Sequence, residues 1–133
     1  MTNERLWAPW RLEYVADPKK EPADGCFLCR SRDESHDKEN LVAARGDRSL
    51  VVLNRFPYNN GHLLVVPADH KAELGDLDDE ELLDCQRWLQ RYVAALTKIM
   101  TPDGFNIGLN LGRAAGAGVP GHLHWHIVPR WKG

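Results

Sequence analysis

One stretch near the end of the sequence decides the fold: His122-Leu123-His124-Trp125-His126-Ile127-Val128-Pro129. Polar and apolar residues alternate through it, which is typical of a strand with one face against a core. Because alternate side chains of a strand point to the same face, the apolar set is expected to pack inward: Leu123, Trp125 and Ile127. The three histidines would then line the opposite, solvent-accessible face: His122, His124 and His126.

Three histidines on one accessible face suit two kinds of chemistry. His-x-His pairs ligate zinc as neutral imidazoles in catalytic metal sites. Alternatively, a neutral imidazole, common at pH 7 because its pKa is near ~6.5, can attack phosphorus while its neighbours handle protons and charge. No acidic residue follows His126, which disfavours a metal oxygenase site that adds a carboxylate to its histidines.

The residues just upstream favour phosphorus chemistry. Six of the eleven glycines lie between 104 and 121. A Gly-rich loop over residues 110–121 leaves backbone N–H groups unobstructed, so it can hold an oxyanion or a phosphate. The loop is not a Walker A motif, since no Gly-Lys-Ser/Thr follows it. A plain flexible connection is the competing interpretation.

Further from this stretch, the sequence indicates a sheet and one long helix. Residues 41–44, 49–54, 63–66 and 105–111 have the composition of strands. Asp78 and Glu81 form a capping box that starts a helix reaching Met100. Residues 30–40 carry seven charged residues and no apolar periodicity, so they are expected to form a solvated loop. The order of elements predicts an α+β domain whose mostly antiparallel sheet carries the helix on one face.

Length and charge narrow the class of protein. The 133 residues fit a single domain, 1–133, with an N-terminal arm over 1–40 and a core over 41–131. A net charge of −2 supplies no strong field for bulk nucleic acid or an anionic membrane. No apolar run is long enough to span a membrane and no signal peptide is expected. Three cysteines are too few for a disulfide scaffold and indicate a cytoplasmic compartment.

The histidine stretch resembles the signature of the histidine-triad (HIT) superfamily of nucleotide hydrolases and transferases. Other segments of the sequence agree with that family, and the resemblance covers most of residues 41–131: Leu53-Asn54-Arg55-x-Pro57, Gly61–Pro67, Gly104-Phe105-Asn106, Asn110-x-Gly112 and Val128–Trp131. Residues 6–11 and 115–119 look like the bacterial branch close to the diadenosine tetraphosphate phosphorylases. The implied fold is an antiparallel sheet of about five strands with one long helix, in a homodimer whose sheets join.

The resemblance also implies roles for single residues. His124 would attack the α-phosphorus of a nucleotide to give a covalent nucleotidyl-histidine, and His126 would contact the phosphate and assist the leaving group. Asn54 would lie at the ribose. The remaining nucleotide and phosphate contacts would come from His62, Asn110, Gly116 and Gly118. Water or inorganic phosphate would discharge the intermediate, since a covalent route splits one difficult displacement into two.

The loop departs from the pattern of many hydrolase members of the family. Those members carry Gln and then Ser or Thr just after the loop glycine, where this sequence has Ala117 and Gly118. The spacing to the first histidine, over residues 119–121, is also one residue longer than usual. A smaller loop could admit a phosphate acceptor, as in the phosphorylase branch.

The pair Cys26-Phe27-Leu28-Cys29 has the spacing of a metal knuckle, which is half of a site. The resemblance implies a structural zinc whose other two ligands are His70 and His122, and this would remove His122 from catalysis. A redox motif and a pair of buried thiols without metal remain alternatives. Cys85, on the apolar side of the helix, is expected to be a buried structural thiol.

Three classes of function therefore remain open. The first is an enzyme that transfers a nucleotidyl group through His124, acting on a dinucleoside polyphosphate or a nucleoside monophosphate conjugate. A variant of it is an ADP-forming phosphorylase of diadenosine tetraphosphate. The second is a non-catalytic nucleotide-binding module, and the third is a zinc hydrolase that uses the histidine row itself.

Overall fold

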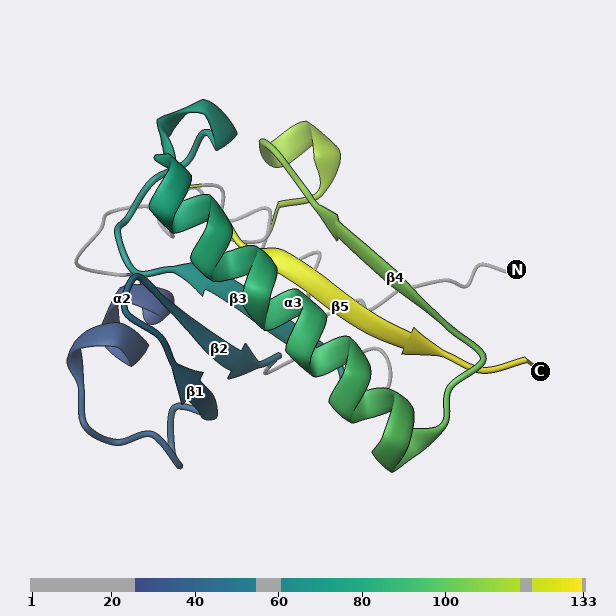
Figure 1. The fold of residues 1–133 in the computed structure, drawn as a ribbon. Helices are drawn as coiled ribbons and strands as arrows, with labels where there is room; N and C mark the ends of the chain where they lie inside the picture. Colours follow the sequence, from purple (N-terminus) through teal and green to yellow (C-terminus); the bar gives the residue numbers. More distant parts are fainter. Residues whose placement is uncertain (1–25, 55–60, 118–120, 133) are drawn as a thin grey trace.

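The computed structural model describes residues 26–54, 61–117 and 121–132. Two helices and a sheet make up this part of the chain (Figure 1). Their bounds, in chain order, are α2 Phe27–Asp33, β1 Val42–Arg45, β2 Ser49–Leu53, β3 Leu63–Pro67, α3 Asp79–Met100, β4 Gly104–Leu109 and β5 Trp125–Arg130. A short 3-10 turn, η3 Leu74–Asp76, precedes α3, and a second, η4 Arg113–Ala115, follows β4.

The sheet has five strands in the order β1-β2-β3-β5-β4, and every neighbouring pair is antiparallel. Consecutive strands form the β1-β2-β3 meander, whereas β5 inserts between β3 and β4. The α+β prediction of an antiparallel sheet of about five strands with one long helix is confirmed. The strand that carries His126 is therefore flanked by a strand on each side.

Strands β2 and β3 are buried on both faces. All five residues of β3 are buried, and so are the first four of β2. Continuous apolar runs are what such strands need, because each side chain meets a layer of protein. Val51 and Val65 face α3, whereas Leu50 and Val52 face α2.

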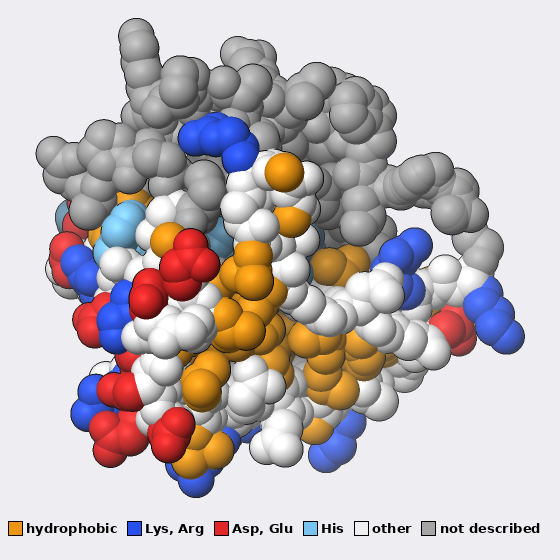
Figure 2. Space-filling model, turned by 90° about the horizontal axis from the view of Figure 1, so that it is seen from above, with side chains coloured by type: hydrophobic (Ala, Val, Ile, Leu, Met, Phe, Trp, Pro, Cys, Tyr) orange, Lys and Arg blue, Asp and Glu red, His pale blue; other side chains and the backbone are white. Residues whose placement is uncertain are grey.

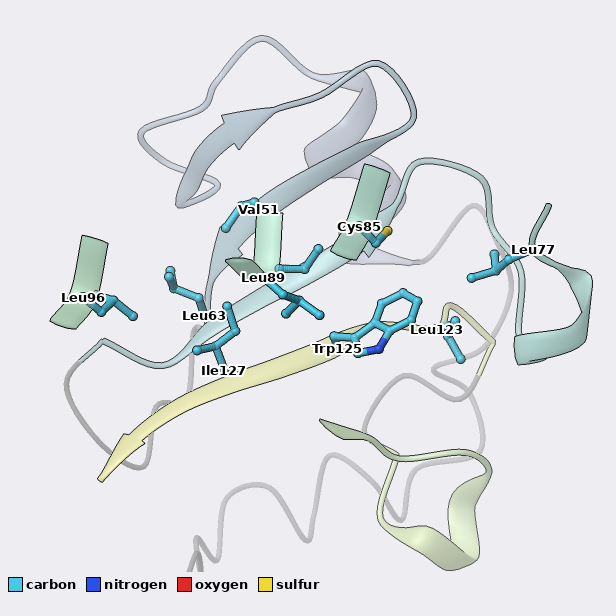
Figure 3. Close-up of a cluster of buried hydrophobic side chains, with 10 residues drawn as sticks. Val51, Leu63, Leu77, Cys85, Leu89, Leu96, Leu123, Trp125 and Ile127 are labelled. Atoms are coloured by element: carbon cyan, nitrogen blue, oxygen red, sulfur yellow. The ribbon is translucent and has the colours of Figure 1, made fainter. Parts of the chain in front are cut away.

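Helix α3 covers one face of the sheet (Figure 1). Its first turn carries the predicted capping box: Glu81 N–H donates to Asp78 Oδ1 and Asp78 N–H donates to Glu81 Oε1, both at 2.8 Å. Cys85, Leu89 and Leu96 recur at helical spacing and point into the core, as Figure 3 shows. They meet side chains from the strands and from the segment before β5: Val51, Leu63, Val65, Leu123, Trp125 and Ile127.

Two local predictions are wrong. The first is the solvated loop over residues 30–40, because residues 30–33 belong to α2. This helix buries Leu28, Cys29 and Ser31 against the second face of the sheet, and its charged residues point outward. Seven residues are too short to show a helical period, so the charge dominated the pattern.

The second wrong prediction is a strand that begins at His122. β5 begins only at Trp125, and residues 122–124 precede the ladder. Leu123 nevertheless faces the α3 core together with Trp125 and Ile127, as the alternation predicts. His122 and His124 are buried, so the predicted solvent-accessible row of histidines is also corrected.

Among the residues that the structure describes, no helix is both long and apolar enough to cross a membrane.

Candidate active site and metal site

His126 and His62 meet on the face of the sheet that lies away from α3. In β5, His126 stands between Trp125 and Ile127, which point toward α3, so its own side chain points the other way. Its partner across the β3–β5 ladder is Leu64, which faces α2. His62 lies two residues before Leu64 and therefore shares its face.

Asn54, His62 and His126 form a chain of contacts. Asn54 Nδ2 lies 3.1 Å from His62 Nδ1 and 3.3 Å from His62 Nε2. His62 Nε2 lies 3.0 Å from His126 Nδ1. An amide nitrogen only donates, so the nearer ring nitrogen, His62 Nδ1, accepts and His62 Nε2 carries the proton. His62 then donates to His126 Nδ1, which places the proton of a neutral His126 on its Nε2.

The ring of His124 is oriented by the main chain. His124 Nδ1 lies 2.9 Å from the carbonyl oxygen of His122. A carbonyl oxygen only accepts, so Nδ1–H of His124 donates and its Nε2 is left with a lone pair. The His124 and His126 rings are 5.0 Å apart between centroids. The unprotonated nitrogen of the neutral ring is the atom that a nucleophilic role requires.

His122 belongs to a different cluster, although it stands only two residues from His124. Its side chain is fully buried, and its Nε2–H donates to the Pro67 carbonyl oxygen at 2.8 Å. Burial lowers the pKa of His122 to about 4, with the Pro67 hydrogen bond acting in the opposite direction. His122 is therefore neutral at pH 7, and its Nδ1 lone pair points toward two thiols.

Those thiols complete a four-residue cluster: Cys26, Cys29, His70 and His122, whose ligand atoms all lie within 4.8 Å of one another. His122 Nδ1 is 3.4 Å from both Cys26 Sγ and Cys29 Sγ, and His70 Nδ1 is 3.2 Å from Cys29 Sγ. Neighbouring ligands of a tetrahedral zinc are about 3.6 Å apart, given Zn–S and Zn–N bonds of ~2.3 and ~2.0 Å. Two thiols and two imidazoles at this spacing fit a closed structural zinc site.

The thiol of Cys29 is neutral without a metal. Its burial, followed by the neighbouring Cys26, raises the pKa of Cys29 to about 11. Ligation requires the thiolate, so binding of a metal at this cluster would release protons.

The predicted phosphate contacts lie around the end of β4. Asn110 is exposed and stands one step beyond the Leu109–Trp125 pair, just as His124 stands one step before Trp125. Gly116 has a φ of +93°, which favours glycine. Its N–H donates to the Arg113 carbonyl oxygen, so in this conformation the turn uses that amide itself. Gly118 lies outside the described residues.

Two hydrogen-bond acceptors of the 122–123 segment were not predicted from sequence. The Pro67 carbonyl accepts from His122, and the Lys71 carbonyl accepts the Leu123 N–H at 2.7 Å. Both acceptors are main-chain atoms, which every residue has, so no residue type in the sequence could indicate them.

Similarity to known proteins identifies the family. The HIT domain family matches residues 35–133, about three quarters of the chain. The chain belongs to the HIT domain family. Its histidine stretch, its helix and its sheet are thus those of a family member, as the resemblance implied.

Individual relatives refine the comparison. The chain is 42% identical to the AP-4-A phosphorylase of Mycobacterium tuberculosis over 98% of this chain and 69% of that protein. It is 37% identical to the adenosine 5'-monophosphoramidase of Schizosaccharomyces pombe over 62% of this chain and 58% of the relative. Both relatives are named as enzymes.

A solved structure with bound zinc is also similar. A zinc-bound histidine triad family protein from Mycobacterium smegmatis matches with a TM-score of 0.70 and 28% identity, covering 84% of this chain and 79% of that one.

Proposed function

We propose that this protein transfers a nucleotidyl group through His124. His124 Nε2 attacks the α-phosphorus of the substrate, and a P–N bond forms while the P–O bond to the leaving group breaks. Water or inorganic phosphate then attacks the same phosphorus and releases His124. The observation that supports this role is the hydrogen bond from His124 Nδ1–H to the His122 carbonyl oxygen, because it leaves the lone pair on Nε2.

His126 is proposed to give a proton to the leaving group. The chain of contacts from Asn54 through His62 supports the tautomer in which His126 Nε2 carries the proton. A proton supplied there neutralises the charge that develops on the departing phosphate oxygen. In the second step the same nitrogen can accept the proton of attacking water.

The nucleotide is proposed to be held by residues around these histidines. Asn54 would lie at the ribose, and Asn110 at the phosphates beside His124. Gly116 and Gly118 would contribute main-chain N–H groups to the phosphates. For Gly116 this requires the amide to exchange its bond to Arg113 for one to the phosphate.

The proposed substrate is diadenosine tetraphosphate, with inorganic phosphate as the acceptor. His124 would take AMP and release ATP, and phosphate would then convert the bound AMP to ADP. The similarity to an AP-4-A phosphorylase supports this choice, and so does the small side chain of Ala117 in the loop. Hydrolysis of an AMP conjugate is the second candidate, supported by the similarity to a monophosphoramidase.

A product assay on diadenosine tetraphosphate, run with and without inorganic phosphate, tests the proposal. ADP and ATP formed only when phosphate is present would establish phosphorolysis. AMP and ATP formed without phosphate would establish hydrolysis. If neither reaction occurs, nor cleavage of an AMP amidate, while AMP still binds, the protein is a nucleotide-binding module and the enzymatic proposal is wrong.

We also propose that Cys26, Cys29, His70 and His122 hold a structural zinc. The ligand spacing and the Nδ1 lone pair of His122 support it, as does the similarity to a zinc-bound relative. When bound, zinc would tie α2 to the segments after β3 and before β5. Its role is structural, since four protein ligands leave no open position for a substrate.

Finally, we propose a cytoplasmic homodimer of a single domain, 1–133, whose sheets join at β4. This strand ends the sheet order and has six residues, whereas β1 at the other edge has four and an irregular register. Ile107 of β4 is 46% exposed. Figure 2, which shows the molecule from above the view of Figure 1, has apolar side chains gathered between charged ones. Light scattering on wild type and Ile107→Lys tests the dimer. A dimer's mass for both proteins would refute this interface.

A further inference from the structure

The segment that carries His122 and His124 lies before the paired part of β5. Because β5 begins at Trp125, the ladder hydrogen bonds start after His124. Two hydrogen bonds tie the described part of the segment to the chain around the end of β3: Leu123 N–H to the Lys71 carbonyl at 2.7 Å, and His122 Nε2–H to the Pro67 carbonyl at 2.8 Å. Both acceptors belong to the stretch from Pro67, the last residue of β3, to Lys71.

One peptide unit links Lys71 to the ring of His124. The Leu123 N–H, which donates to Lys71, and the His122 C=O, which accepts from His124 Nδ1, belong to the same peptide bond. A trans peptide is planar, and its N–H and C=O point in opposite directions. The direction of the His122 carbonyl, and with it the orientation of the His124 ring, therefore follows from where the Lys71 carbonyl lies.

Lys71 itself is held by its side chain. Lys71 Nζ donates to Glu81 Oε1 at 2.8 Å, while Asp69 lies farther away at 3.9 Å. The Glu81 side chain is 3% exposed, and the same oxygen accepts the Asp78 N–H of the capping box. A capping box needs only the backbone partner, but a buried carboxylate needs a countercharge. The Lys71 ammonium supplies that charge and thereby anchors the residue to the first turn of α3.

We propose that Lys71 is a positioning residue for His124. Its ion pair with Glu81 fixes the Lys71 carbonyl, this carbonyl clamps the 122–123 peptide, and the clamped peptide keeps the lone pair of His124 on Nε2 for attack. The inference rests on the proposed nucleophilic role of His124. It adds to that role a link from the start of α3 to the reacting ring.

Lys71→Met tests the link, and Asp78→Ala is its matched control. Asp78→Ala removes the cap bond from the Glu81 N–H but leaves the Lys71–Glu81 pair, so it lowers Tm without touching the clamp. At equal zinc content, Lys71→Met should lower kcat roughly 10- to 100-fold, as loss of a supporting partner often does, with KM changed less than about 3-fold. Lys71→Arg should restore most of kcat, and Asp78→Ala should keep the wild-type value. Equal kcat in Lys71→Met and Asp78→Ala at similar Tm would overturn the proposal.

A second measurement does not depend on turnover. Imidazole ¹⁵N NMR on the full chain should show His124 as the Nδ1–H tautomer in wild type, Lys71→Arg and Asp78→Ala, and as a tautomer mixture in Lys71→Met. An unchanged His124 tautomer in Lys71→Met would refute the clamp, even if kcat falls. If the wild type turns over no nucleotide, the proposed function fails, whereas the NMR comparison still decides whether Lys71 orients the ring.

Discussion

Both faces of the sheet bury cysteines, but the thiols of Cys85 and Cys29 have different surroundings. Cys85 lies on the α3 face among apolar side chains, and burial, followed by the carboxylates of Asp84 and Glu81, raises its pKa to about 12. Cys29 lies on the other face, where His70 and His122 present nitrogens at 3.2 and 3.4 Å. Burial makes both thiols neutral, but only Cys29 has neighbours with which it can share a metal. The α3 face thus supplies stability, and the opposite face holds the candidate metal ligands and the His62–His126 contact.

The largest effect should come from His124, on the face of the sheet opposite α3. His124→Ala should lower turnover of diadenosine tetraphosphate at least about 10⁴-fold, because it removes the attacking nitrogen. Rapid acid quench with labelled substrate should find acid-labile label on the wild type and none on the variant. The control is His36→Ala, whose side chain is 69% exposed in the charged loop. Equal labelling of His124→Ala and wild type would refute the assignment.

A core residue on the α3 face should affect stability instead. Ile127 is fully buried beside His126 but points toward α3. Ile127→Ala should lower the free energy of unfolding by about 2–5 kcal/mol, through lost burial and the cavity left behind. Urea denaturation measures it, with Ile99→Ala as the control because Ile99 is 77% exposed on α3. A loss for Ile127→Ala no larger than that for Ile99→Ala would remove the distinction between the faces.

The two cysteines can be compared directly by metal content. Cys29→Ala should reduce bound zinc from about one ion per chain toward none, because a structural site needs all four ligands. Cys85→Ala should keep the metal, and so should His124→Ala, although His124 is only two residues from His122. The assay is zinc quantitation after dialysis against a weak chelator. Zinc lost from His124→Ala and kept in Cys29→Ala would reverse the assignment of the two clusters.

The sequence predicted which face of the sheet a side chain occupies better than it predicted where the strands and helices begin and end. Alternation correctly assigned Leu123, Trp125 and Ile127 to the core, because side-chain direction depends only on a local period of two. It could not show that the ladder starts at Trp125, since strand ends depend on the partner strand. Helix α2 was missed for a related reason. Seven residues with three charges contain no readable period, and the helix owes its stability to Leu28 and Cys29 packing on β2 and β3.

The site was predictable wherever a residue type carries the chemistry. The Cys-x-x-Cys spacing and the family resemblance together named all four residues that the fold brings within 4.8 Å. The separation of His122 from His124 depended on the resemblance, because a bare alternating pattern treats the three histidines alike. The main-chain acceptors at Pro67 and Lys71 could not be predicted, because their role depends on where the backbone passes and not on the side chain.

The smallest effect concerns the thiol of Cys85 and appears only in alkali. Its pKa is raised from 9.0 to about 12 in the folded chain, so the unfolded chain loses this proton first as the pH rises. The folded state is therefore favoured fully below pH 9, and the advantage is lost progressively as the pH rises toward 12. Between pH 9 and pH 10 the free energy of unfolding of wild type should fall by about 1 kcal/mol more than that of Cys85→Ala, by the linkage of a single group. Because other titrating groups are common to both proteins, the difference between their urea midpoints isolates this thiol. Parallel curves across that range would mean that Cys85 is accessible enough to ionise in the folded state, and the α3 face would then not be the dry layer that its apolar neighbours indicate.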